Sequence, residues 1–565
     1  MNIGLHLISM PWSNPLTPSI QLGALKAYVK DLKIPELDIQ TYHAHFLIPF
    51  LSTQQDFAEF YKHCDSTEEY IYSLLYLREF GQRQLKKKID LKSLLAAVNK
   101  SKETNQSLKK KISMNDIARL CKGTNKFIES YLVPRLSDSG INLIGFTLNH
   151  HQVVAAAYVM TYLKVNHSNR RFRFICGGTN AIVPSVVELF RKLDLAPICV
   201  FGEGEKKLES ICRAISTLPP GTDDKILDHI ILGSSTGVFD ASGEKNLWVK
   251  DPEDYKGQIK DISKLPLPDY SDYFELLKDC CESEDDYQDI KSQVTLLIEG
   301  SRGCFAKCAF CGLNYLWEGF RRIESDNVLK RSIEMVETYG TNKICFVDNV
   351  CDTWAEGYAE ELIKSKIKIP AFMEMRSHHP EVFWTKLALA GVNTMQIGVE
   401  ALSPGILVAI GKGTRVIQNL AAIKYLTELK INSISNLITS HPGATVDDIK
   451  ETKRVLELTA HFHDLKPSKF LLALGSPLFE KIPAELRPKL KPYRTVKFPK
   501  DLSFFCQEFW HIPPEDWVPV EVKKEWAAFV VWKEKLDEKN KLIKPNLRVE
   551  RMPNSRVAEI GRAHV

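Results

Sequence analysis

Strand-like and helix-like segments alternate twice along this chain, and that alternation limits the folds open to it more than any other feature. The first series covers about residues 3–215 and the second about 294–474. Strands separated by long helical segments do not pair as hairpins, so each series predicts a parallel sheet covered by crossover helices. The 565 residues are also too many for one ordinary hydrophobic core. We therefore expect an α/β protein with at least two domains.

The first series predicts a doubly wound N-terminal domain over residues 1–233. Its strands are expected at 3–8, 37–42, 142–147, 173–176 and 197–201, and its last three helices at 152–165, 184–193 and 205–215. A Pro-rich loop after the first strand leads into a helix that we expect to be capped by Ser19. A polar and aromatic helical stretch, about 54–136, interrupts the series and carries no chemical motif, so we interpret it as a helical insertion.

Three short loops follow strands of the first series, at 147–151, 177–180 and 202–205. Open parallel sheets bind ligands in the crevice outside the carboxyl ends of their strands, where these loops are expected to lie. The positions that we expect to contact a ligand are Thr147, Asn149, Gly177, Gly178, Thr179, Gly202, Glu203, Gly204 and Glu205.

The second series predicts a partial (β/α)6 barrel over residues 294–480. Its six strands are expected at 294–298, 344–347, 371–375, 394–399, 434–438 and 470–474. Reactive groups in such barrels lie at the carboxyl ends of the strands. Residues 234–293 are expected to form a linker between the domains, stiffened by Pro266 and Pro268.

The C-terminal region is harder to interpret. It is rich in Pro, Trp and Lys, and over 481–558 we expect a cap on the barrel mouth with a helix at 521–540. The terminal letters EIGRAHV, at 559–565, look like a translated sequencing adapter. We expect that stretch to be an artefact and the natural chain to continue differently.

Three cysteines follow the first strand of the second series, in the stretch LLIEGSRGCFAKCAFCGLN. Cys304, Cys308 and Cys311 have C-x3-C-x2-C spacing. A 4Fe–4S cluster held by only three thiolates leaves one iron open to a substrate. Zinc is the alternative, but zinc sites usually join two close cysteines to a second pair or to histidines, and no such pair follows at a fitting distance. The cysteines therefore predict an iron–sulfur cluster with an open iron.

Bulk composition excludes several partners. The net charge is only +5, and the basic runs at 86–88 and 109–111 lack interleaved aromatic residues, so we expect no nucleic-acid partner. We also expect no membrane partner, because no apolar run is long enough to span a bilayer and no signal segment begins the chain. Thirteen scattered cysteines, an odd number, argue against a disulfide framework and favour a reducing, cytoplasmic location.

The chain resembles the cobalamin-dependent radical S-adenosylmethionine (SAM) enzymes. The cysteine spacing, with Phe310 before the last cysteine, is similar to the radical SAM signature. The GG and GEGE loops, at 177–178 and 202–205, resemble those that line the cobalamin nucleotide-tail pocket. The phrases CGLN, FVDNV, VEALS, IGKGT and SHPGAT narrow the resemblance to C-methyltransferases that mature ribosomally made peptides (RiPPs), over about 18–499.

This resemblance implies three cofactors: a 4Fe–4S cluster, SAM and cobalamin. Cobalamin would take a methyl group from one SAM, the cluster would cleave another, and the methyl would pass to an unactivated carbon. The implied partners are a peptide substrate and an electron donor of the flavodoxin or ferredoxin type. A carboxylate such as Glu400 suits the SAM ribose, and Arg376 suits the methionine carboxylate. The SAM-binding candidates at the barrel strand ends are Asp348, Asn349, Glu374, Arg376, Glu400 and Ser403.

Several alternatives stay open. The D-x-H-x-x-G motif that supplies a histidine to cobalt in many cobalamin mutases is absent from this sequence, so the resemblance implies cobalamin without a protein histidine. His150 and His151 are the candidates for the opposite case. The enzyme would instead be an oxidoreductase or rearranging enzyme if it used the same cofactors without methyl transfer. A non-enzymatic cobalamin or redox sensor is the third possibility, and the sequence names no substrate.

Overall fold

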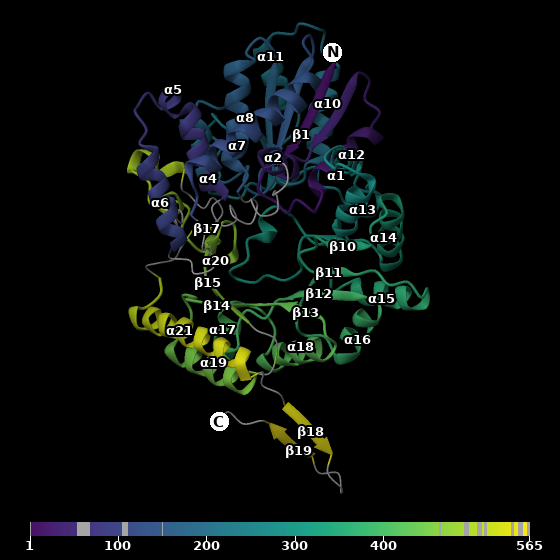
Figure 1. Cartoon of the computed structure of the whole chain (residues 1–565), viewed down its shortest axis with the longest axis vertical. Helices are drawn as coiled ribbons and strands as arrows, with labels where there is room; N and C mark the ends of the chain where they lie inside the picture. Colours follow the sequence, from purple (N-terminus) through teal and green to yellow (C-terminus); the bar gives the residue numbers. More distant parts are fainter. Residues whose placement is uncertain are drawn as a thin grey trace.

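The structure is a computed structural model, and it describes residues 2–53, 68–103, 111–149, 151–460, 462, 465–490, 496–505, 511–512, 517–543, 547–551 and 557–561. Two α/β units lie one above the other in Figure 1, the first in purple to blue and the second in teal to green. The α/β class expected from the alternation is confirmed.

The first sheet has six strands in the order β2-β1-β3-β4-β5-β6. These are β1 (Ile3–Ser9), β2 (Leu37–Tyr42), β3 (Ile141–Thr147), β4 (Phe172–Gly177), β5 (Ile198–Val200) and β6 (Val238–Asp240). The first five, all predicted, are parallel, and β6 is antiparallel to β5. Because β2 and β3 lie on opposite sides of β1, the strand order reverses there, and α/β sheets leave a ligand crevice at such a switch point.

The helices of the first unit begin close to where the sequence predicts them. Ser19 caps α1 (Ile20–Asp31), since its hydroxyl accepts a hydrogen bond from the backbone N–H of Leu22. The three helices that follow β3, β4 and β5 are α8 (Val153–Asn166), α9 (Pro184–Lys192) and α10 (Glu205–Ser216). The insertion is helical, but it begins earlier than expected, with α2 (Ala44–Thr53), which packs against α7 (Met114–Phe127).

The expected linker is more structured than predicted. Its β6 belongs to the first sheet, so the first unit extends beyond residue 233. Residues 265–270, around the two prolines, have no helix or strand, and α12 (Ser271–Asp279) and α13 (Glu284–Gln293) follow. An ion pair of 2.6 Å between Lys26 Nζ and Asp272 Oδ1 ties α12 to α1. The segment therefore docks on the first unit as it leads into the second.

The second sheet has five parallel strands in the order β13-β12-β11-β10-β7. They are β7 (Thr295–Ile298), β10 (Lys343–Phe346), β11 (Ala371–Met375), β12 (Val392–Ile397) and β13 (Asn432–Ile434). A parallel pair, β14 (Asn436–Thr439) with β15 (Lys466–Lys469), continues the curve through a bridge between Glu400 and Leu437. The predicted fifth strand is thus split at Ser435. The strand that pairs with β14 is β15, before the sixth strand predicted at 470–474, and the predicted range holds only β16 (Leu472–Ala473), which pairs antiparallel with β17 (His511–Ile512).

The C-terminal helix α21 (Val520–Ile543) does not cover the barrel mouth as predicted. It packs against α19 (Val446–Leu458), where Lys453 and Glu525 form an ion pair of 2.7 Å. Figure 1 shows both helices at the end of the molecule far from the first sheet. The strands β18 (Leu547–Arg551) and β19 (Val557–Gly561) pair with each other and extend away from both units. Among the described helices, none is long and apolar enough to cross a membrane.

Candidate active site

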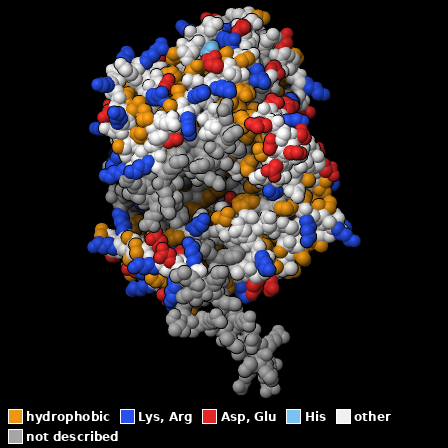
Figure 2. All heavy atoms as spheres, in the orientation of Figure 1, with side chains coloured by type: hydrophobic (Ala, Val, Ile, Leu, Met, Phe, Trp, Pro, Cys, Tyr) orange, Lys and Arg blue, Asp and Glu red, His pale blue; other side chains and the backbone are white. Residues whose placement is uncertain are grey.

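A pocket of about 430 Å³ lies between the carboxyl edges of the two sheets. One wall is formed by the ends of β1, β3, β4 and β5, at the switch point of the first sheet. The opposite wall is formed by residues at the end of β7 and in the loops after β7 and β10 of the second sheet. Figure 2 shows the surface hollowed at the level where the two units meet.

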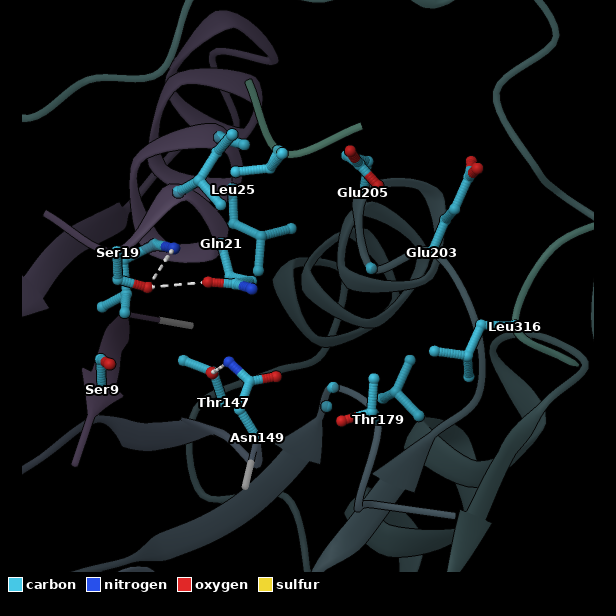
Figure 3. Close-up of a pocket in the computed structure, with 18 of the residues that line it drawn as sticks. Ser9, Ser19, Gln21, Leu25, Thr147, Asn149, Thr179, Glu203, Glu205 and Leu316 are labelled. Carbon is cyan, nitrogen blue, oxygen red and sulfur yellow. Dashed lines mark hydrogen bonds between the residues drawn. The ribbon is translucent and has the colours of Figure 1, made fainter. Parts of the chain in front are cut away.

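The first-sheet wall brings together every position that the three loops predict. Thr147, Asn149, Gly177, Gly178, Thr179, Gly202, Glu203, Gly204 and Glu205 all line the pocket. Ser19 and Gln21, at the start of α1, stand opposite Thr147 and Asn149 (Figure 3). Gln21 was not predicted, because a single Gln near a helix start gives no signal of its own. The structure shows that these positions share one pocket; which of them contact a ligand stays a prediction.

Glycines keep the first-sheet wall open. A Cβ placed on Gly177 would meet no other atom within 4 Å, so a side chain there would extend into free space. Gly178 has a φ of +93°, and its Cβ would approach the backbone of Leu148 to 3.0 Å. Only glycine adopts this conformation without strain. The wall therefore offers backbone and space in place of side chains.

Glu203 and Glu205 have partners across the boundary between the units. Arg302 Nη2 lies 2.6 Å from Glu205 Oε1, and Arg321 Nη1 lies 2.6 Å from Glu203 Oε1. Burial alone would raise the pKa of Glu205, but the Arg302 guanidinium outweighs it and lowers that pKa. Buried ion pairs of this kind fix geometry more than they add stability. The two glutamates thus join the GEGE loop to the cysteine loop.

The cysteine loop forms part of the opposite wall, through Ser301, Arg302 and Gly303. A Cβ on Gly303 would lie 2.3 Å from the carbonyl oxygen of Gly319, and the φ of Gly303 is +81°, so the sharp turn before Cys304 requires glycine. Two hydrogen bonds of the Asn314 side chain stabilise the loop. Its Oδ1 accepts one from the Cys304 backbone N–H at 2.9 Å, and its Nδ2 donates one to the Cys304 carbonyl at 3.0 Å.

The three cysteines follow β7 in one loop. Burial is the largest cause that raises the pKa of Cys311, and with the nearby Cys308 and Cys304 it brings that pKa to about 11, although a hydrogen bond with the Leu313 backbone opposes the rise. Metal ions bind thiolates and release the thiol protons, so a cluster would reverse this shift. The loop that carries them begins at the carboxyl end of β7, and that the three thiols hold one cluster stays a prediction.

Four charged residues of the second unit lie near one another. Lys412 Nζ is 3.0 Å from Glu400 Oε1, and Arg376 donates a hydrogen bond to the Lys412 carbonyl. Burial raises the pKa of Glu374 to about 7, and the nearby Glu400 carboxylate adds to that rise while Lys412 opposes it. Burial raises the pKa of Cys304, and the charges of Arg376 and Lys412 oppose that rise in part. Lys412 is not among the predicted SAM contacts, although the phrase IGKGT contains it.

Two of the predicted SAM contacts have internal partners instead. Asp348 is buried, and its carboxylate accepts from the Gly300 N–H at 2.9 Å and from Trp354 Nε1 at 3.0 Å. Ser403 is buried at the start of α17 (Pro404–Ala409), where its hydroxyl accepts from the Gly405 N–H at 3.2 Å. Both residues therefore support loops, and a contact of either with SAM stays a prediction. Asn349, in contrast, lines the pocket.

The two histidines considered as cobalt ligands have different outcomes. His150 lies outside the described residues. His151 is exposed, has a φ of +66° and does not belong to the pocket lining among the described residues. The expectation that no protein histidine reaches the ligand is untested at His150, and nothing in the described structure favours a ligand role for His151.

Comparisons with known proteins agree with this arrangement. Residues 298–456 match the Radical SAM superfamily. Over 311 residues, 52% of this chain and 60% of the relative, the chain is 23% identical to "Uncharacterized methyltransferase PH0819" of Pyrococcus horikoshii. Over 358 residues, 58% of this chain and 44% of the relative, it is 23% identical to 4'-phospho-dehydrooxetanocin synthase of Priestia megaterium. The matches therefore span only about half the length of these relatives.

Two solved structures share the fold over nearly the whole chain. The first is the cobalamin-dependent SAM radical enzyme OxsB with aqua-cobalamin and SAM bound (TM-score 0.57, 14% identity, 95% of this chain and 67% of that one). The second is the radical SAM methyltransferase TsrM of Kitasatospora setae with tryptophan and a SAM analogue bound (TM-score 0.54, 12% identity, 94% and 89%). At these identities the likeness shows the fold.

Proposed function

We propose that this chain, which carries a radical SAM domain, is a cobalamin-dependent methyltransferase that methylates an unactivated carbon. The observation that carries the proposal is the shared pocket, because the glycine loops and the cysteine loop line one hollow from opposite sides. The superfamily match at 298–456 supports the radical chemistry. The fold shared with OxsB and TsrM supports the pairing of cobalamin with SAM.

The residues beside the cysteines fit a 4Fe–4S cluster and SAM. Cys304, Cys308 and Cys311 would hold the cluster, which supplies the electron that cleaves SAM when it is bound. The ion pair with Lys412 orients the Glu400 carboxylate as an acceptor for the SAM ribose hydroxyls. Arg376 uses one N–H on the Lys412 carbonyl and has others for the methionine carboxylate.

The first-sheet wall fits cobalamin. A large, flat cofactor needs free space and backbone contacts, which Gly177, Gly178 and Gly202 provide. Cobalamin supplies the methyl carrier when it is bound, so the protein needs only to hold it, exclude water and fix its distance from SAM. The Arg302 and Arg321 ion pairs fix that distance, because they hold the GEGE loop against the cysteine loop.

For the substrate we propose a peptide, with a flavodoxin- or ferredoxin-type protein as electron donor. The phrases CGLN, VEALS and IGKGT support the peptide, through their resemblance to peptide-maturation methyltransferases. A second candidate is radical oxidation or rearrangement without methyl transfer. The relative named 4'-phospho-dehydrooxetanocin synthase favours it, because that name describes no methyltransferase.

Labelled SAM separates the two candidates. The anaerobically reconstituted protein is given cobalamin, a reductant, SAM with a deuterated methyl group and candidate precursor peptides. Methyl transfer predicts a labelled methyl in the product, with both S-adenosylhomocysteine and 5′-deoxyadenosine released. Altered product and 5′-deoxyadenosine without S-adenosylhomocysteine would establish the second candidate. Failure to form 5′-deoxyadenosine under any condition would contradict both and favour a sensor.

A further inference from the structure

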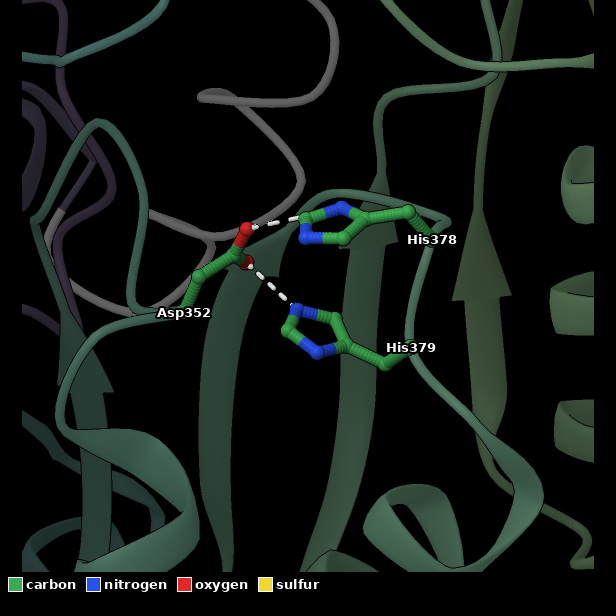
Figure 4. Close-up of side chains that lie close together, drawn as sticks. All are labelled: Asp352, His378 and His379. Atoms are coloured by element: carbon green, nitrogen blue, oxygen red, sulfur yellow. Dashed lines mark ion pairs between the residues drawn. The ribbon is translucent and has the colours of Figure 1, made fainter.

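Asp352, His378 and His379 come together at the carboxyl edge of the second sheet (Figure 4). Asp352 follows β10, and the two histidines follow β11. His379 Nε2 lies 3.3 Å from Asp352 Oδ1, and His378 Nδ1 lies 4.0 Å from Asp352 Oδ2. One potential metal-ligand atom from each residue lies within 4.8 Å of the other two. Neither the cysteine loop nor the pocket lining includes these side chains.

Two buried polar atoms of this group have no hydrogen-bond partner among the described residues. The Asp352 side chain is only 4% exposed, yet its Oδ2 accepts no hydrogen bond, and the buried Nε2 of His379 also lacks a partner with hydrogen-bond geometry. A polar atom that is buried without a hydrogen-bond partner destabilises the folded protein. Asp352 Oδ2 and His379 Nε2 therefore need a bonding partner that the described part of the protein does not supply.

An ordinary histidine–carboxylate pair in the same chain shows the difference. His167 Nε2 lies 2.9 Å from Glu129 Oε1 and is aligned to hydrogen bond with it. Asp352 and His379 are close but not aligned, so they do not satisfy each other. Their positions are fixed by other contacts. Asp352 Oδ1 accepts a hydrogen bond from the Arg376 backbone N–H at 3.0 Å. The His379 ring stacks on the Phe383 ring, with 3.9 Å between the ring centroids.

We propose that Asp352, His378 and His379 form a binding site for a divalent first-row transition-metal ion, separate from the cysteine cluster. Two imidazole nitrogens and a carboxylate are ligands that Zn²⁺ and Fe²⁺ prefer. An ion at this point satisfies the two unpaired atoms and is held by supports that are already in place. Three protein ligands leave a coordination position open.

The open coordination position lets the bound ion take a ligand from outside the protein. The His378 side chain is 41% exposed, so the site is accessible from solvent. It lies at the same strand ends as Arg376, whose backbone N–H contacts Asp352 and whose side chain contacts the Lys412 carbonyl. The ion would therefore bind an oxygen ligand, such as a substrate carboxylate or phosphate, at the barrel edge and hold it by Lewis-acid attraction. This task depends on the proposed function, whereas metal binding itself does not.

Zinc is a suitable probe, because its X-ray absorption edge is distinct from that of the cluster iron. The full-length, cluster-loaded protein is titrated with Zn²⁺ by calorimetry, and the complex is measured by zinc X-ray absorption. We expect one Zn²⁺ per chain with nitrogen and oxygen ligands at about 2.0–2.1 Å. His378→Ala and Asp352→Asn should each weaken binding by roughly tenfold or more. His167→Ala is the matched control and should bind Zn²⁺ as the wild type does.

Three results would overturn the proposal. The first is no Zn²⁺ binding at micromolar concentration by the cluster-loaded protein. The three side chains would then interact only with one another and with solvent. The second is a sulfur shell at about 2.3 Å, which would place the ion on cysteines. The third is unchanged affinity in both His378→Ala and His379→Ala. Because His378 is half-exposed, its variant should fold even where Asp352→Asn does not.

Discussion

The two sheet edges that face each other across the pocket are built from different chemistry. The first edge is made of glycines, hydroxyl groups and apolar side chains, and its two glutamates are occupied by arginines from the other unit. The second edge carries three thiols, the Lys412–Glu400 pair, Glu374 and Arg376, together with the Asp352–histidine group.

Because of this difference, the two edges suit different kinds of cofactor. A cofactor that carries its own reactive centre needs space and a rigid boundary, which glycine supplies. A cluster and a charged cosubstrate need ligands and counter-charges, which only side chains supply. Variants of the second edge should therefore cause losses of specific chemistry, whereas variants of the first edge should cause losses through steric obstruction.

The largest effect is expected from the cysteines. Replacing Cys304, Cys308 and Cys311 together by Ala should abolish the brown chromophore and 5′-deoxyadenosine release, because the loop then has no thiolate to hold iron. Cobalamin binding should persist, since the first edge is unchanged. Iron content and optical spectra provide the measurement, and Cys281→Ala, outside the loop, is the control. Full iron retention in the triple variant would show that the cluster lies elsewhere.

The next effect distinguishes space from ligands. Gly177→Leu adds a side chain where no protein atom lies within 4 Å, so the fold and the cluster should survive while cobalamin is obstructed. We expect affinity to fall roughly 100-fold, at the upper end of overpacking costs. Equilibrium binding of hydroxocobalamin tests this, with Gly233→Leu, at an equally open position away from the pocket, as control. Unchanged affinity would mean that cobalamin does not occupy this wall.

Glu400→Gln should act on SAM alone. Losing a hydrogen bond to a charged group costs about 1.5–3 kcal/mol, so SAM affinity should fall roughly tenfold to a hundredfold. The cluster spectrum of SAM-free protein should not change. Glu428→Gln removes a comparable ion pair with Lys424 on an outer helix and should leave SAM binding intact. A lower melting temperature with normal SAM affinity would make Glu400 a purely structural residue.

The most gradual effect concerns pH, where a buried group in each unit changes stability with opposite sign. Burial raises the pKa of Glu374 from 4.5 to about 7, so its contribution to stability is present below pH 4.5 and lost as pH rises through 7. Burial lowers the pKa of His6 from 6.5 to about 4, so its contribution is present above pH 6.5 and lost as pH falls through 4.

Thermal unfolding of cofactor-free variants tests that difference. Relative to the wild type, Glu374→Gln should become more stable between pH 5 and pH 7, by at most about 1.4 kcal/mol per pH unit. His6→Asn should change in the opposite direction over the same range. Parallel pH curves for both variants and the wild type would show that neither buried group titrates as its surroundings indicate.

The sequence predicts the features that depend on residues close together along the chain. The strand at 37–42, the Ser19 cap and the cysteine loop all have local signals, and all are present. What the sequence does not predict depends on distant partners. Glu203 and Glu205 look like ligand contacts until Arg302 and Arg321, about a hundred residues away, are placed beside them.

Other differences arise in the same way. Asp348 looks like a strand-end ligand, but its partners Gly300 and Trp354 are set by packing between loops. The fifth barrel strand is split at Ser435 because β13 pairs with β12 whereas β14 pairs with β15. Asp352 and the two histidines come from separate strand ends, so only the sheet register brings them together.

The central claim is that cobalamin and the cluster occupy opposite walls of one pocket. Pulsed electron paramagnetic resonance on protein that holds both cob(II)alamin and the reduced cluster measures the magnetic dipolar coupling between them. If the two cofactors face each other, we expect a resolved coupling that disappears in the Cys304, Cys308 and Cys311 triple variant while the cob(II)alamin signal remains. Two uncoupled signals in the doubly loaded protein would place the cofactors in separate sites and contradict the account.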